Sequence, residues 1–244
     1  MMNALFIARR EFASFFATPV AYVFIAIFLM MSSILTFFVG DLFSRGQADL
    51  LPFFNFHAWL YLFLVPAIAM RTWAEERRSG TIELLMTLPV TVTEAVVGKF
   101  IAGWAVLLLA LMLTFPLWLT VNYLGHPDNG VILAAYIGSW LMAGAFLAIS
   151  MCMSALTRNQ VIAFVMAVVV CFAFVLSGSD IILSAFSGWA DNSVLDTVAS
   201  FSFLTHFEAM SRGVLALNDV IYFILVTGLW LYASQIIVEQ NKAA

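Results

Sequence analysis

Charged residues are scarce in this sequence of 244 residues. Asp, Glu, Lys and Arg make up 10% of it and hydrophobic residues 64%, with a mean hydropathy of +1.05, whereas about a quarter of an ordinary soluble domain is charged. A water-soluble fold of this composition would expose large apolar patches, because a domain of this size still has an extensive surface. The scarcity of charge excludes a soluble protein and predicts an integral membrane protein.

Cysteine and histidine are also few. Cys152 and Cys171 both fall inside apolar segments, which argues against a disulfide framework or a zinc site. The three histidines, His57, His126 and His206, are scattered and have no metal-ligand spacing. We therefore expect no metal and no cofactor bound by this chain.

All 24 charged side chains, 10 basic and 14 acidic, lie outside six long apolar segments. The segments are approximately 20–40, 53–70, 100–123, 131–156, 161–176 and 220–238. A bilayer core about 30 Å thick needs roughly 20 helical residues. The segments lack the alternation of a barrel, so they must be helices. The sequence predicts an all-α polytopic membrane protein with six transmembrane helices, forming a single transmembrane domain over residues 1–244.

The absence of charge within the expected spans disfavours transport coupled to an ion at the bilayer midplane. His57 is the titratable exception. It lies near the outer end of its span beside Trp59 and Tyr61, so we interpret it as a residue of the headgroup-level aromatic belt. A membrane protease is disfavoured, because Ser177 and His206 form only a generic pattern and not a convergent nucleophile and base.

No phosphate-binding loop is present either. The only Gly-Lys pair, Gly98-Lys99, is followed by Phe100 instead of the Ser or Thr that such a loop requires. No convincing set of catalytic groups converges elsewhere. We therefore expect that the chain is not an enzyme, and that any nucleotide energy comes from another polypeptide.

The basic residues predict the orientation. Six spans place both termini on one side, together with the loops 71–99 and 157–160. That side carries eight bases and six acids, a net charge of +2, and the other side carries two bases and eight acids, a net charge of −6. By the positive-inside rule both termini are cytoplasmic. The net acidity gives no indication of a nucleic-acid partner, and none is expected.

The first twenty residues combine bases with apolar residues at helical spacing. A short amphipathic helix at the cytoplasmic interface would place Arg9 and Arg10 in water and Phe12 in lipid. The alternative is that the first span starts early. The apolar run from Val20 is too long for the core of a signal peptide, so we interpret it as a retained span.

The loop 71–99 is the densest in charge. Its first part, 72–79, consists of good helix formers and is interrupted by Gly80. A second short helix is predicted over 81–88, where Pro89 stops it, because proline disfavours helix at the preceding residue.

The end of this loop has the spacing of a capping box, at Thr91 and Glu94, which predicts the start of the helix into the third span. The loop would thus hold a short helix across the membrane surface, with charged and apolar groups suited to docking a soluble partner. The alternative is a solvated connector. Equal numbers of acids and bases disfavour a lipid-binding basic patch.

Two further regions carry weaker signals. The region 177–219 has apolar patches at 181–189 and 194–204 that are too short to cross a bilayer, so they are re-entrant helices or a small extracellular cap. The fourth segment has pairs of small residues that permit close helix approach. Packing within one subunit is favoured over a dimer contact for these pairs, which are Ala134/Gly138 and Gly144/Ala148.

The loop also carries an ordered motif, E-E-x-x-x-G-T-x-E-x-L-x-x-x-P-V. It stands here at Glu75, Glu76, Gly80, Thr81, Glu83, Leu85, Pro89 and Val90, with Glu94, Gly98 and Lys99 downstream. This order and spacing resemble the signature of the membrane subunits of type-2 ABC exporters, where it also lies between the second and third of six spans. The resemblance covers essentially the whole chain, and residues 200–225 resemble the gliding-motility branch.

The resemblance implies a permease subunit of an ATP-driven exporter in the bacterial cytoplasmic (inner) membrane. Its partners would be a cytoplasmic ABC ATPase that binds ATP and Mg, a second copy or paralogue of the permease, the lipid bilayer and an accessory extracytoplasmic protein. It also supports re-entrant or extracellular helices between spans five and six. The alternative function is a non-transporting membrane anchor or mechanotransmitter driven by a partner ATPase.

The resemblance further implies that the helix after Arg71 is a coupling helix that transmits ATPase movement to the spans. Coupling requires its contacts to differ between the two ATPase states. The implied ATPase-coupling residues are Glu75, Glu76, Arg77, Arg78, Gly80, Thr81, Glu83, Leu84, Leu85 and Pro89.

Overall fold

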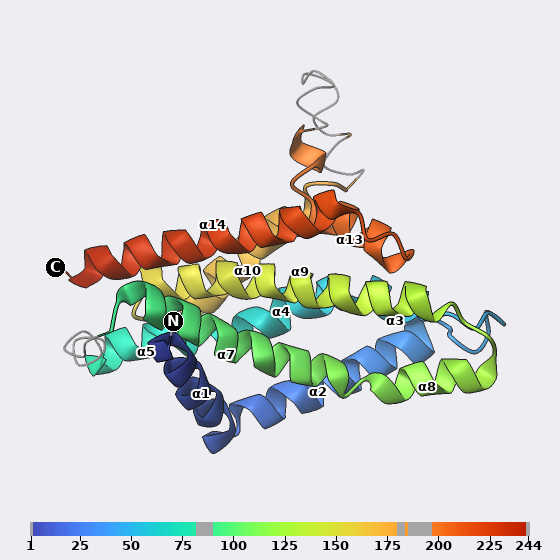
Figure 1. Ribbon diagram of the computed structural model, residues 1–244, viewed down its shortest axis with the longest axis horizontal. Coiled ribbons are helices and arrows are strands. Elements are labelled where there is room, and N and C mark those ends of the chain that lie inside the picture. The colour runs from blue at the N-terminus through green and yellow to red at the C-terminus, as the bar shows by residue number, and fades with distance from the viewer. Residues whose placement is uncertain (1, 82–89, 180–183, 185–196, 243–244) are drawn as a thin grey trace.

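A computed structural model describes residues 2–81, 90–179, 184 and 197–242, and these residues form an elongated bundle of helices without strands (Figure 1). The helices are α1 Met2–Ala17, α2 Val20–Ile34, the π-helix η1 Leu35–Val39, α3 Leu51–Asn55, α4 His57–Ala69, α5 Arg71–Ser79, α7 Val92–Met112, α8 Phe115–Leu124, α9 Asn129–Leu156, α10 Gln160–Leu176, α13 Phe203–Ser211 and α14 Leu217–Lys242.

Several of these helices are long and apolar enough to cross a bilayer. Four qualify among the described residues, namely Val20–Val39, Val92–Leu124, Asn129–Leu156 and Leu217–Gln240. The helix α10 is apolar but has 17 residues, and α4 has 13. The all-α polytopic membrane fold is confirmed, while the count of six spans stays a prediction.

The helix α9 is the centre of the bundle, with α14, α10, α4, α13, α7 and α5 packed around it. Its glycines bring neighbours close. A Cβ at Gly138 would lie 2.7 Å from Met210 of α13, and one at Gly144 would lie 2.9 Å from the Trp104 ring of α7. The small residues of this span therefore pack helices within the subunit, as the sequence favoured.

The N-terminal helix α1 is separate from the first span, because the helical conformation is interrupted at Thr18 and Pro19. The helices α1 and α2 meet at a steep angle (Figure 1). The buried residues Ala4 and Ile7 of α1 pack against α7. They approach so closely that a Cβ at Gly98 would lie 2.8 Å from the Ala4 carbonyl oxygen. The alternative in which the first span simply starts early is wrong.

Local signals in the sequence mark the ends of the elements on either side of the charged loop. Gly80 ends α5 with a φ of 73°, a conformation in which other residues are strained. The predicted capping box is confirmed at the start of α7, where Thr91 Oγ1 accepts from the Glu94 N–H at 3.2 Å and Glu94 accepts from the Thr91 N–H at 3.2 Å.

One expected helix is divided in the structure, and other predicted segments lie largely outside the described residues. The third span, expected as one helix over 100–123, is divided into α7 and α8 at Leu113 and Thr114. The predicted helix 81–88 and the patch 181–189 lie almost entirely outside the described residues. Only the end of the patch 194–204 is described, and the helix α13, which is buried on one face, begins at Phe203.

Candidate coupling site

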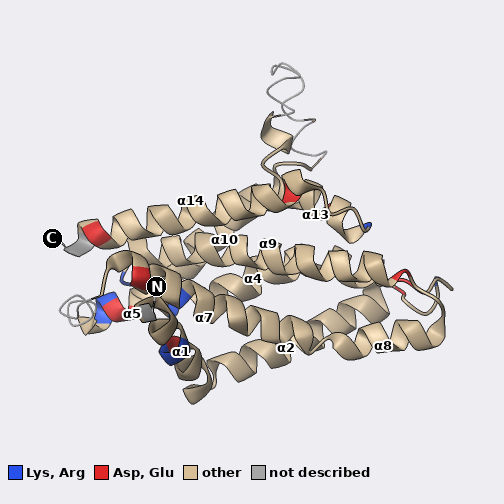
Figure 2. Ribbon diagram, viewed as in Figure 1, with Lys and Arg blue, Asp and Glu red and all other residues tan. Residues whose placement is uncertain are grey.

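Charged residues gather mainly at one end of the bundle (Figure 2). There, α5 lies beside α1, the start of α7 and the end of α9, and we call this the α5 end. The opposite end, which carries α13 and the start of α14, is called the α13 end. The apolar bodies of the helices separate the two.

The start of α5 is fastened to α9 by a single serine. Ser154 Oγ accepts from the backbone N–H groups of Trp73 and Ala74, both at 3.1 Å, and donates to the Met70 carbonyl oxygen at 2.8 Å. The first N–H groups of a helix have no partner within it, so a buried helix start needs such an acceptor. Trp73 and Ala74 are fully buried, and Ser154 satisfies the N–H groups at this junction.

Charged residues extend this attachment along α5. Arg77 Nη1 donates to the Ala155 carbonyl oxygen at 2.7 Å. Glu75 Oε2 accepts from Arg71 Nε at 2.9 Å and from Gln160 Nε2, at the start of α10, at 2.6 Å. The hydrogen bond from Arg71 holds the pKa of Glu75 below its usual value. The helix α5 is thus bound to both α9 and α10.

Lys99 of α7 forms ion pairs with carboxylates of two other helices at the α5 end. Its Nζ lies 2.7 Å from Glu76 Oε1 of α5 and 3.4 Å from Glu11 Oε2 of α1, with its side chain 4% exposed. The same ammonium lies 5.2 Å from the centroid of the Trp73 ring, a cation–π distance. Burial raises the pKa of Glu11, but Lys99 and Arg10 lower it further, so that the net shift is downward. One buried cation therefore connects α1, α5 and α7.

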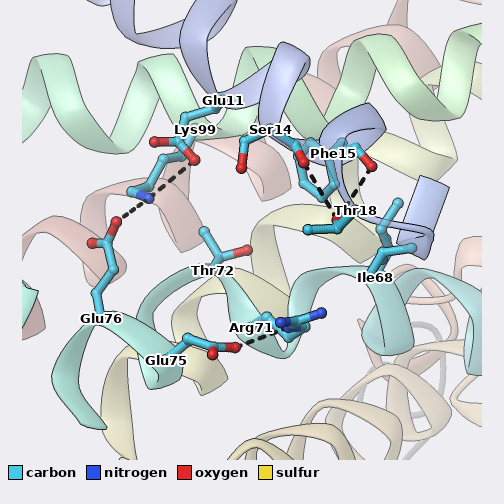
Figure 3. A pocket seen from close by; sticks show the side chains of 11 residues that line it. Glu11, Ser14, Phe15, Thr18, Ile68, Arg71, Thr72, Glu75, Glu76 and Lys99 are labelled. Atoms are coloured by element: carbon cyan, nitrogen blue, oxygen red, sulfur yellow. Dashed lines mark hydrogen bonds and ion pairs between the residues drawn. The ribbon is translucent and has the colours of Figure 1, made fainter. Parts of the chain in front are cut away.

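A cavity of about 260 Å³ opens beside this ion pair (Figure 3). Its lining combines carboxylate and basic side chains from α1, α5 and α7 with three hydroxyl side chains and with the apolar residues Phe15, Val20 and Ile68. The cavity lies where α1 turns into the first apolar helix.

The structure divides the predicted coupling residues into two groups. Glu75, Glu76 and Arg77 bind other parts of this same chain, whereas Arg78 is exposed, as are Gly80 and Thr81. The remaining predicted residues lie outside the described residues, and they are Glu83, Leu84, Leu85 and Pro89. In the N-terminal helix, Arg9 and Arg10 are exposed and Phe12 is half-buried.

The interpretation of His57 as an exposed residue of an aromatic belt is wrong. Its side chain is fully buried, its Nδ1 lies 2.7 Å from Ser139 Oγ, and Tyr61 OH lies 2.8 Å from the same oxygen. Phe53 packs edge-on against the imidazole at 4.3 Å between ring centroids. Of the aromatic residues that suggested a belt, Trp59 is exposed but Tyr61 is buried.

The α13 end has a smaller polar junction of its own. His206 Nδ1 lies 2.6 Å from Asp219 Oδ1, and His206 Nε2 lies 2.9 Å from the Ser200 carbonyl oxygen. Tyr222 stacks on the imidazole at 3.8 Å between centroids. These contacts join α13 to the start of α14, which follows it in the chain.

The apolar helical bundle with a charged helix fastened across one end defines a polytopic membrane protein. The family model of the ABC-2 family transporter proteins matches residues 50–238. The chain belongs to this family and is a membrane component of an ABC transporter. No curated protein matches the chain. The matched region includes Glu76, Lys99 and Ser154, whereas Glu11 precedes it.

Proposed function

We propose that this chain is the permease subunit of an ATP-driven exporter, and that α5 transmits the movement of a separate ATPase to the transmembrane helices. The observation that carries the proposal is the attachment of α5 to four helices, to α9 through Ser154, to α10 through Glu75, and to α7 and α1 through Lys99. A force on α5 therefore reaches both the centre of the bundle and its N-terminal helix.

The two faces of α5 have different parts in this mechanism. Glu75, Glu76 and Arg77 hold the helix against the permease, so they pass movement on. Arg78 is the exposed charge of the described helix and is the group we assign to the ATPase surface. Glu83 and Leu84, which follow in the same loop, complete the proposed contact.

The proposed orientation places the α5 end and both termini in the cytoplasm of a bacterium, because eight of the ten basic residues belong to that side. ATP is hydrolysed in the cytoplasm, so the ATPase would meet α5 there. A second permease copy or paralogue would complete the transport path, and an accessory protein would act on the outer side.

Charge reversal at Arg78 tests this assignment. The full-length permease is purified together with the ATPase that binds it, and binding and ATPase activity are measured separately in lipid nanodiscs. We expect Arg78→Glu to weaken ATPase binding about tenfold, because one charge-assisted contact is lost. The matched control is Arg45→Glu at the opposite end, which should leave binding unchanged. Equal binding by both variants, or a stable complex that contains no ATPase, would refute the proposal.

A further inference from the structure

Another cavity at the α5 end, of about 580 Å³, lies at the turn where α9 ends and α10 begins. Its lining consists of Arg78 of α5, the loop 157–159, and Gln160 and Val161 at the start of α10. Two guanidinium groups, those of Arg78 and Arg158, thus line it, and no carboxylate of a described residue does. Neither arginine forms an ion pair with a described side chain. This lining favours an anionic ligand.

A third arginine adds to the positive charge beside this cavity. Burial lowers the pKa of Arg77, and the nearby charge of Arg158 lowers it further. The carboxylate of Glu75 is already bound by two other side chains of the permease. The segment 82–89, which follows α5, contains a single acid. One acid cannot balance three arginines, so positive charge stays in excess at this turn.

The exposed side chains of α10 add an apolar surface to the cavity. Val161 lines the cavity, and Val165, Val169 and Phe172 follow it along the helix at intervals of three or four residues. All four side chains are exposed, and their spacing places them on one face of α10. An acidic group of a soluble protein would use the arginines alone, whereas a lipid would use both the arginines and this face.

The length of α10 indicates the depth of the cavity in the membrane. Its 17 residues extend about 26 Å at about 1.5 Å per residue, which is less than the hydrocarbon core of about 30 Å. As the expected fifth span, α10 must therefore begin at the membrane boundary, and Arg158, which precedes it by two residues, lies among the headgroups. Basic pockets between transmembrane helices on the cytoplasmic side bind anionic headgroups.

We propose that this cavity binds an anionic phospholipid from the adjacent leaflet. The lipid phosphate accepts from the guanidinium of Arg158, and an acyl chain lies along Val161 and Val165 of α10. Arg78 raises the positive potential of the cavity and keeps its assignment to the ATPase. A zwitterionic lipid binds more weakly, because its ammonium meets two arginines and no carboxylate of the described lining. The proposal rests neither on the ATPase nor on the direction of transport.

Lipid retention by the purified full-length chain tests the site. The delipidated protein in detergent is exposed to equal amounts of phosphatidylglycerol and phosphatidylethanolamine with the same acyl chains, and bound lipid is measured by native mass spectrometry. We expect about 25-fold enrichment of phosphatidylglycerol, because each of the two arginines contributes about fivefold to the binding of an anionic headgroup. Equal retention of the two lipids would overturn the proposal.

Single substitutions of arginine locate the lipid. Arg158→Gln should lower the enrichment about fivefold, whereas Arg158→Lys, which keeps the charge, should retain most of it. The matched control is Arg9→Gln, which removes the same charge from α1, outside the lining of the cavity, and should leave the enrichment unchanged. Thermal unfolding of each variant establishes that it is folded. An equal loss of enrichment in Arg158→Gln and Arg9→Gln would show a diffuse attraction to the whole basic end and would overturn the assignment.

A soluble competitor separates the lipid from its headgroup. Free glycerophosphate carries an anionic phosphate without acyl chains. We expect it to leave phosphatidylglycerol bound at the same concentration, because it does not cover the apolar face of α10. Displacement as complete as that by an excess of unlabelled phosphatidylglycerol would contradict a lipid ligand.

Two further outcomes would identify another occupant. The same mass spectra resolve dimers, and phosphatidylglycerol bound to monomers but absent from dimers would show that a second copy of the chain covers this face. In the assembled complex, Arg158→Gln should bind the ATPase as the unmodified chain does. A loss of ATPase binding with unchanged lipid enrichment would show that the cavity takes an acidic group of the ATPase. Either outcome would overturn the proposal.

Discussion

The polar junctions at the two ends of the bundle differ in what they connect. At the α5 end, Lys99 binds Glu76, 23 residues away in the chain, and also reaches Glu11 on the first helix. At the α13 end, His206 and Asp219 are 13 residues apart on consecutive described helices. The first junction therefore joins helices that are far apart in the chain, whereas the second joins two helices that follow one another.

This difference assigns different consequences to the two junctions. Loss of the Lys99 contacts removes the ionic link from α7 to both α1 and α5, so it should affect both stability and coupling. Loss of the His206 contact loosens the corner between α13 and α14, so it should affect stability alone.

The largest effect is expected from Lys99→Met. This change leaves Glu76 without its cation and Glu11 with Arg10 alone, and loss of one partner of a buried ion pair costs about 3–5 kcal/mol. Because both glutamates keep about 20% exposure, the lower end of that range is expected. Denaturant unfolding of the purified chain measures the change. The control is Arg10→Met, which breaks a pair whose arginine side chain is 57% exposed and should change little. An unaltered unfolding midpoint for Lys99→Met would contradict the claim that Lys99 stabilises the junction of α1, α5 and α7.

The next effect concerns Ser154→Ala. The substitution leaves two buried backbone N–H groups of α5 without their acceptor, and we expect a loss of about 1–3 kcal/mol in the free energy of unfolding. The matched control is Ser150→Ala, one turn earlier on α9, because the hydrogen bonds of Ser150 join it to the Phe146 carbonyl oxygen in its own helix and to Cys171 of α10, and none joins it to α5. If both variants lose the same stability, Ser154 does not hold α5 in the way described.

At the other end, Asp219→Asn should cost about 1–2 kcal/mol, because a buried hydrogen bond to a charged group is weakened. The side chains of His206 and Asp219 are 18% and 12% exposed. Permease-dependent stimulation of the ATPase should remain at the unmodified level in this variant. A loss of stimulation without a loss of stability would show that the α13 end also takes part in coupling.

The smallest effect is a dependence on acid. In the folded chain the pKa of Glu11 lies below its ordinary value of 4.5. The stability that the ionised Glu11 contributes is therefore present above about pH 4.5 and is lost as the pH falls through the lowered pKa. Glu11→Gln should therefore flatten the decline in unfolding temperature at acidic pH. A parallel decline in the variant and the unmodified chain would exclude Glu11 as a source of the acid sensitivity.

The parts of the coupling site that the sequence predicted correctly depend on neighbouring residues. The end of α5 at Gly80 and the capping box of Thr91 and Glu94 are properties of a few consecutive positions. A serine near the end of an apolar helix carries no comparable signal, so the contact of Ser154 with Trp73, across 81 residues, emerged only from the fold.

The same limit explains the error at His57. A histidine beside Trp59 and Tyr61 has the local pattern of an aromatic belt, and its actual partner, Ser139, lies 82 residues away. The position of Lys99 was noted in the motif, but its pairing with Glu11 requires that α1 fold back across α7. The positions of the charged residues in the sequence did not predict this arrangement of α1 and α7.

The most direct test of the account is ATPase stimulation by the Ser154→Ala permease in the assembled complex. The serine is buried inside the junction of α5 and α9, whereas Arg78, to which we assign ATPase binding, is exposed. The account predicts that the variant binds the ATPase as the unmodified chain does but loses most of the permease-dependent stimulation, while Ser150→Ala retains it. Normal stimulation by a folded Ser154→Ala permease would contradict the claim that α5 transmits movement through this junction.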